Sequence, residues 1–139
     1  MTAARRWAYA LTVQATLRDT DAMGHVNNAV HVTWFEQART LYVFDRMGLS
    51  DVSEFAFILG STSIRYVSPV RLHEKVEIRC APSRIGTASW DLVYEGRALT
   101  DGRVVVEGSS VQVQYDYARR APRPLDGAWR RFLEADLTP

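Results

Sequence analysis

The sequence has 139 residues but only one cysteine, Cys80, and only three histidines, and neither sign of charge is in excess. A single cysteine excludes an internal disulfide and a cysteine-rich metal site, and it suits the reducing cytoplasm. Seventeen basic residues against sixteen acidic ones leave a net charge of +1. No global field therefore attracts nucleic acid or an acidic membrane, and any site for a polyanion must be local.

Long hydrophobic runs are also missing. No stretch approaches the roughly 18 apolar residues of a membrane span, and residues 1–21 lack the sustained apolar segment of a signal peptide. The length is typical of one domain, and a hydrophobic content of 47% is that of an ordinary globular protein. We therefore expect a cytoplasmic protein with a single domain over residues 1–139 and a core over about 7–117.

The N-terminal third combines a strand pattern, a polar loop and a long helix pattern. Residues 7–17 are apolar and β-branched with loose alternation, which predicts a first strand. The turn-forming residues that follow lead into a helix from about Asn28 to Met47. Asn27 or Asn28 is the expected N-cap, and Gly48 is the expected C-cap.

The helix pattern is apolar on more than one side. At 100° per residue, one broad stripe collects Val30, Trp34, Phe35, Ala38, Leu41 and Tyr42, and the opposite side collects Thr33, Glu36, Gln37, Arg39 and Thr40. Further apolar residues, including Val43 and Phe44, lie outside this stripe. We expect the helix to be covered from several directions. The i, i+3 spacing of Glu36 and Arg39 predicts an ion pair on its polar side.

The remaining chain shows strand patterns up to a short amphipathic helix at about 125–135. The pattern predicts four antiparallel strands near residues 54–67, 75–80, 89–99 and 103–117, with a hairpin turn at Asp101-Gly102. Gly60 in the first of these strands indicates either a bulge or a close approach by another backbone or a ligand. The predicted fold class is α+β, an antiparallel sheet of about five strands wrapped around one long helix. Such a sheet leaves an open edge, so dimerisation is expected.

The polar loop and helix start carry a family motif. Asp19-Thr20-Asp21-x-x-Gly24-His25-Val26-Asn27-Asn28, followed by Phe35-Glu36-x-Ala38-Arg39 and Ile64-x-Tyr66-x-x-Pro69, resembles the 4-hydroxybenzoyl-CoA thioesterase-like branch of the hotdog superfamily, which is related to acyl-carrier-protein thioesterases. The resemblance covers roughly residues 9–117. It implies a homodimer or tetramer that hydrolyses acyl-CoA or acyl-carrier-protein thioesters at the subunit interface without a metal or other cofactor.

The resemblance assigns roles to three residues of the loop. Asp21 matches the catalytic carboxylate, as nucleophile or as general base, and the backbone N–H of Asn28 matches the donor that polarises the thioester carbonyl. The chemistry agrees, because thioester hydrolysis needs a carboxylate and oxyanion donors, and a helix N-terminus offers unpaired N–H groups. His25 matches a histidine that some relatives use in catalysis; the alternative is a bond to the loop backbone.

Other candidates for substrate binding have ordinary structural alternatives. Gly24 and Asn27 belong to the motif, although Asn27 is also a natural cap. Gly60 and Ser61 fall where some relatives place polar groups of the neighbouring subunit, but Ser61 also suits a plain strand position. The remaining candidates, Arg119 and Arg120, could bind coenzyme A phosphates or form a solvated basic tail.

Three further patterns qualify this interpretation. A calcium loop that starts at Asp19 fails, because Met23 and Val30 occupy two of the required ligand positions. His31 is interpreted as a satisfied core or interface histidine. The pair His73-Glu74 replaces the Gly-Asp that is usual in relatives, so His73 would have to accept a positive φ.

Two alternative functions remain open on the same fold. One is a hotdog domain that binds acyl-CoA without turning it over, which would show saturable binding and no thiol release. The other is an enoyl-CoA hydratase or dehydratase, which needs a histidine poised to move a proton at the β-carbon.

Overall fold

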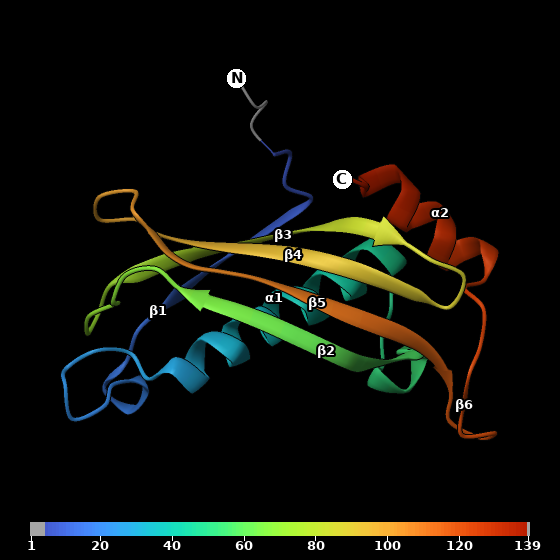
Figure 1. The fold of residues 1–139 in the computed structure, drawn as a ribbon, viewed down its shortest axis with the longest axis horizontal. Helices are drawn as coiled ribbons and strands as arrows, with labels where there is room; N and C mark the ends of the chain where they lie inside the picture. Colours follow the sequence, from blue (N-terminus) through green and yellow to red (C-terminus); the bar gives the residue numbers. More distant parts are fainter. Residues whose placement is uncertain (1–4, 139) are drawn as a thin grey trace.

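The computed structural model describes residues 5–138 as one curled antiparallel sheet with two helices (Figure 1). The strands are β1 (Tyr9–Gln14), β2 (Phe57–Tyr66), β3 (Lys75–Ile85), β4 (Ser89–Ala98), β5 (Val104–Asp116) and β6 (Ala121–Pro122). The helices are α1 (Asn28–Met47) and α2 (Gly127–Asp136), with short 3-10 turns at Leu17–Asp19 and Val52–Glu54. Five strands follow the order β1-β3-β4-β5-β2, and β6 pairs with β5. The α+β class and the antiparallel sheet are confirmed.

Local sequence signals set the two ends of α1. The Asn27 side chain accepts a hydrogen bond from the backbone N–H of Ala29 at 2.9 Å, so Asn27 is the N-cap. Gly48 ends the helix with a φ of 63°, a left-handed conformation that favours glycine. The predicted helix bounds and both caps are confirmed, with Asn28 as the first helical residue.

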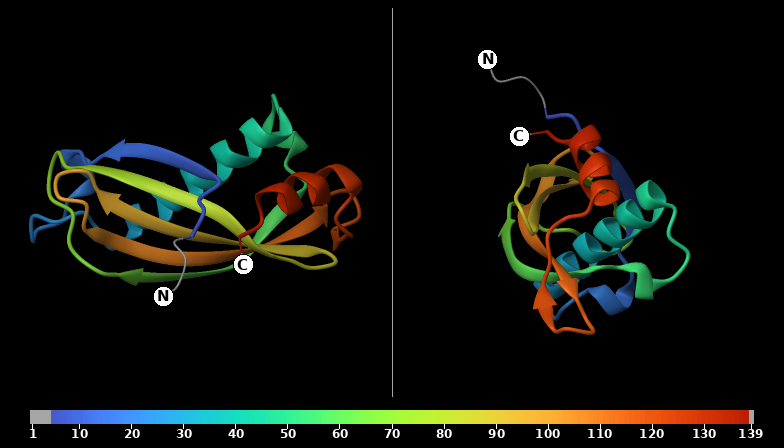
Figure 2. Two further views of the ribbon diagram at one scale, coloured as in Figure 1. Left: turned by 90° about the horizontal axis from the view of Figure 1, so that it is seen from above. Right: turned by 90° about the vertical axis from the view of Figure 1, so that its right-hand side faces the viewer.

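The sheet curls around α1, as the two views of Figure 2 show, and the core lies between them. Phe35 of α1 stacks on Tyr94 of β4 with ring centroids 4.4 Å apart. Gly108 of β5 permits this approach, since a Cβ there would lie 2.6 Å from the Phe35 ring. The contact fixes the helix against the middle of the sheet.

The polar side of α1 differs from the prediction. Arg39 is only 8% exposed and donates a hydrogen bond to the Tyr94 hydroxyl at 3.1 Å, whereas Glu36 is exposed. The predicted Glu36–Arg39 ion pair is therefore wrong. Leu41, expected in the core stripe, is 39% exposed. Val43 is fully buried, which confirms that the helix is covered on more than one side.

Helix α2 packs against α1 and covers part of its surface. The hydroxyl of Tyr42 in α1 donates to the Asp136 carboxylate at 2.9 Å, and Arg46 bonds the same oxygen at 2.9 Å. Trp129 and Leu133 of α2 are buried in the core. The predicted C-terminal helix therefore caps one end of the sheet.

The strands confirm two local predictions. The pairing of β2 with β5 shifts register between Leu59 and Ser61, so a bulge lies at Gly60. His73 has a φ of 69°, the positive value that its place in the turn implied. Cys80 is buried in β3.

Strand β2 ends the sheet order, and most of its residues are exposed. Leu59 is 44% exposed on this strand. Over residues 5–138, no helix is both long enough and apolar enough to span a membrane.

Candidate active site

The loop before α1 is closed by its own backbone. The N–H of Asp21 donates to the His25 carbonyl at 2.8 Å, and the N–H of Gly24 donates to the Asp21 carbonyl at 3.1 Å. Gly24 has a φ of 79°, which a residue with a side chain rarely adopts. The motif glycine is therefore required by the turn that sets Asp21 opposite His25.

The Asp21 carboxylate is exposed and only partly engaged. Its Oδ1 accepts a hydrogen bond from the Met23 N–H at 2.8 Å and a long one from the His25 N–H at 3.5 Å. Neither of these bonds uses Oδ2, and no other bond within residues 5–138 does. One oxygen thus orients the side chain, while the other is available to a substrate or water.

The N-terminus of α1 offers an unused donor next to this loop. Asn27 caps the N–H of Ala29, and the N–H of Val30 donates to the Asn27 carbonyl at 2.9 Å. Within residues 5–138, the N–H of Asn28 has no such acceptor. The Tyr66 hydroxyl donates to the Asn28 carbonyl at 2.9 Å and ties the helix start to the end of β2.

A cavity of about 310 Å³ joins these groups. It is lined by residues of the loop, the start of α1 and the segment after β2: Asp21, Met23, His25, Val26, Asn28, His31, Tyr66, Val67, Ser68 and Pro69. The three predicted catalytic residues therefore face one cavity. Two other hollows do not contain the Asp21 carboxylate or the Asn28 N–H. One has about 410 Å³ and lies around Arg65 and Glu95, and the other has about 490 Å³ and lies between β1 and α1.

The other predicted residues are spread over the chain. Gly24 and Asn27 belong to the loop but are not among the residues that line the cavity. Gly60 and Ser61 lie exposed on β2, also outside the lining. The turn that contains Arg119 and Arg120 lies beside β6, at the opposite end of the molecule from the loop of residues 20–27 (Figures 1 and 2). Substrate contact by these residues stays a prediction.

His31 lines the same cavity, and sequence reasoning underrated it. The residue is only 3% exposed, and in the part of the chain that the structure describes its Nδ1 has no hydrogen-bond partner. Burial lowers the pKa of its imidazole to about 4. The prediction of a buried histidine is right, but within residues 5–138 the ring is not satisfied as a core histidine would be; an interface role stays a prediction. Its six-residue distance from His25 gave no sequence signal that the two would share a cavity.

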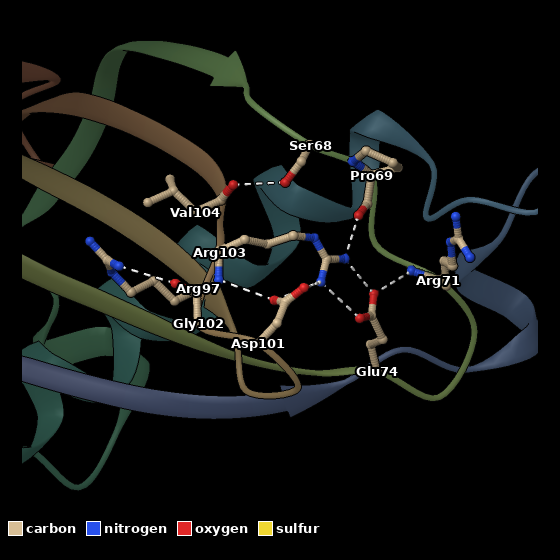
Figure 3. Close-up of polar contacts among 9 residues, drawn as sticks. All are labelled: Ser68, Pro69, Arg71, Glu74, Arg97, Asp101, Gly102, Arg103 and Val104. Carbon is tan, nitrogen blue, oxygen red and sulfur yellow. Dashed lines mark hydrogen bonds and ion pairs between the residues drawn. The ribbon is translucent and has the colours of Figure 1, made fainter.

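An ion cluster supports the rim of the cavity (Figure 3). The Arg103 guanidinium bonds both oxygens of Glu74 at 3.0 and 2.8 Å, Asp101 at 3.0 Å and the Pro69 carbonyl at 2.8 Å. Glu74 in turn accepts a bond from the Arg71 N–H at 2.9 Å. These bonds lower the pKa of the Glu74 carboxyl to about 2, chiefly through Arg103.

The cluster reaches the loop through the backbone. The N–H of Val26 donates to the Val70 carbonyl at 2.8 Å, and His25 pairs with Arg71 in a β-bridge. Arg103 therefore binds the segment from Pro69 to Glu74, and the backbone of that segment in turn pairs with residues 25–26 of the loop. No group of three or more His, Cys, Asp and Glu residues in the described part of the chain is arranged to hold a metal ion.

Comparisons with known proteins agree with this geometry. The model of the thioesterase-like superfamily matches residues 15–133, so the chain belongs to this superfamily. An acyl-CoA thioester hydrolase, YbgC of Escherichia coli, is 28% identical over 118 residues, which are 81% of this chain and 86% of the relative.

Solved structures show the same fold. A thioesterase of Thermus thermophilus, described as complexed with coenzyme A and Zn, superposes with a TM-score of 0.82 at 28% identity over 93% of this chain and 94% of its own. A predicted thioesterase from Bacillus stearothermophilus gives 0.85 at 24% identity over 94% and 98%. The hotdog fold and the thioesterase class expected from the motif are confirmed.

Proposed function

We propose that the protein hydrolyses acyl-CoA thioesters, with acyl-carrier-protein thioesters as the related substrate class. One observation carries the proposal: the partly free Asp21 carboxylate and the unbonded Asn28 N–H line the same cavity. The family and the 28% identical acyl-CoA hydrolase support the same chemistry.

The proposed roles follow from the positions of the groups. The thioester carbonyl oxygen accepts a hydrogen bond from the Asn28 N–H, which stabilises the oxyanion together with the positive end of the α1 dipole. Asp21 either removes a proton from the attacking water or attacks the carbonyl carbon itself, in which case the anhydride that forms is then hydrolysed by water. A C–O bond forms, the C–S bond breaks, and the thiolate takes a proton, so that water and thioester yield acid and thiol. His25, beside Asp21, is the proposed proton carrier or substrate contact.

Self-association is part of the proposal. Strand β2 leaves one edge of the sheet unpaired, and Ile58 and Leu59 expose apolar surface there. A second copy paired at this edge would cover both features and place Gly60 and Ser61 at the interface. We propose a homodimer or a tetramer. Sedimentation of an active monomer at assay concentration would contradict this.

The location is proposed to be the cytoplasm, where a buried free thiol such as Cys80 stays reduced. Recovery of the native protein from an oxidising compartment would contradict it.

The function is tested by thiol release from a panel of acyl-CoA and acyl-carrier-protein thioesters, with Asp21→Asn as the inactive variant. We expect hydrolysis of at least one substrate class by the wild type. Saturable acyl-CoA binding without thiol release would instead identify a binding domain, and hydration of an enoyl-CoA would identify a hydratase.

A further inference from the structure

His31 is a buried polar side chain without a partner in the wall of the candidate site. It lies one helical turn after Asn28 and is 3% exposed. Its Nδ1 is buried and has no hydrogen-bond partner among residues 5–138. Buried polar groups are nearly always hydrogen-bonded, so this ring calls for a partner that belongs to function rather than to the core.

Neighbouring rings hold the imidazole in place. Its centroid lies 5.1 Å from the Trp34 ring and 5.3 Å from the Tyr66 ring, with edge-to-face angles of 71° and 69°. Tyr66 is itself tied to the Asn28 carbonyl. The ring is therefore preorganised, and its position is coupled to the helix N-terminus that would polarise a thioester.

The chemistry of the ring restricts the group that it can bind. Burial keeps the imidazole neutral, since its pKa is lowered to about 4. A neutral imidazole offers one N–H donor and one nitrogen acceptor but no charge. It suits a hydroxyl or a carbonyl oxygen, and it gives no advantage to a carboxylate.

The spacing on the helix restricts where that oxygen lies on the substrate. His31 lies three positions after Asn28, which is a rise of about 4.5 Å along the axis. If the thioester carbonyl oxygen meets the Asn28 N–H and the acyl chain follows the helix towards His31, an oxygen on the third carbon is the substituent that this spacing would bring to the imidazole.

We propose that His31 is a specificity residue that hydrogen-bonds a hydroxyl or oxo group on the third carbon of the acyl chain. This inference rests on the proposed function of the site. It names the substrate class as 3-hydroxyacyl or 3-oxoacyl thioesters and leaves the roles of Asp21 and Asn28 unchanged.

The kinetic test compares 3-hydroxybutanoyl-CoA with butanoyl-CoA. We expect the wild type to favour the hydroxylated thioester by about tenfold or more in kcat/KM, as one buried hydrogen bond would give. His31→Phe keeps an aromatic ring, removes both ring nitrogens and should bring the ratio near one. His31→Gln, which can still hydrogen-bond, should retain part of the preference. An unchanged ratio in His31→Phe would overturn the proposal.

A binding test needs neither turnover nor a variant. The thioether analogues of the same two substrates replace the scissile carbonyl linkage with one that cannot be hydrolysed, and their Kd values for the wild type are measured by calorimetry. Tighter binding of the hydroxylated analogue, by about tenfold, supports the proposal even if no thioester is cleaved. Equal Kd values would overturn it, while Asp21-dependent hydrolysis of either thioester would leave the proposed function standing.

Discussion

Replacement of Asn28 by proline isolates the backbone N–H from every other property of the helix start. Asn28 is the first helical residue, where proline is favoured because its missing N–H has no helical partner. Asn27 has φ −61° and ψ 139°, the extended conformation that a residue before proline prefers. The variant should therefore keep the helix while it removes the proposed oxyanion donor.

The expected loss follows from the role of that donor. Removal of one oxyanion-hole hydrogen bond costs about 10²- to 10³-fold in kcat, or about 2.7–4 kcal/mol of transition-state stabilisation. The proline ring also fills the space in front of the nitrogen, which acts in the same direction. Asn28→Ala is the matched control: it keeps the N–H and loses only a side chain that has no hydrogen bond among residues 5–138.

The assay measures thiol release by wild type, Asn28→Pro and Asn28→Ala at saturating acyl-CoA, with thermal unfolding as the check on folding. We expect the alanine variant within a few-fold of the wild type and the proline variant at least 10²-fold slower. A folded proline variant with nearly full rate, or an alanine variant as slow as the proline one, would refute the oxyanion role of this N–H.

Three further predictions concern the rim of the cavity and the turn at His73. Arg103→Met should lower the free energy of unfolding by about 1–3 kcal/mol, because Glu74 and the Pro69 carbonyl lose the guanidinium that bonds both, and it should raise KM; unchanged urea denaturation and KM would contradict this. The Glu74 carboxyl has its pKa lowered from 4.5 to about 2, so its stabilising contribution is complete above pH 4.5 and is lost as the pH falls towards 2. The wild type should therefore lose more stability than Glu74→Gln over that range, and parallel pH curves would count against the linkage. His73→Gly should raise the free energy of unfolding by about 0.5–1 kcal/mol, since glycine accepts the φ of 69° without strain; a lower denaturation midpoint would exclude strain there.

The helix and strands could be predicted because their signals are local. Asn27 caps α1, Gly48 ends it and the bulge lies at Gly60, each as short-range chemistry implied. The positive φ of His73 was expected because relatives usually have glycine at this position. In each case, one residue and its immediate neighbours decide the backbone conformation.

The site was predicted only in part because its remaining contacts join distant segments. Arg39 bonds Tyr94, 55 residues away, instead of its helical neighbour Glu36. Arg103 bonds Glu74 at a separation of 29 residues. Helix periodicity gives the direction of a side chain but not its partner, so the rim cluster and the unsatisfied ring of His31 became visible only in three dimensions.

The central claim, that Asp21 is the catalytic carboxylate, is tested most directly by Asp21→Asn beside Asp19→Asn. The first change keeps an oxygen that can accept the Met23 N–H and removes the charge; the second removes a charge two residues away that bonds Thr16. We measure kcat for thiol release from one saturating acyl-CoA thioester. The account predicts a loss of at least about 10²-fold for Asp21→Asn and a rate within a few-fold of wild type for Asp19→Asn. Full activity in a folded Asp21→Asn protein would contradict it.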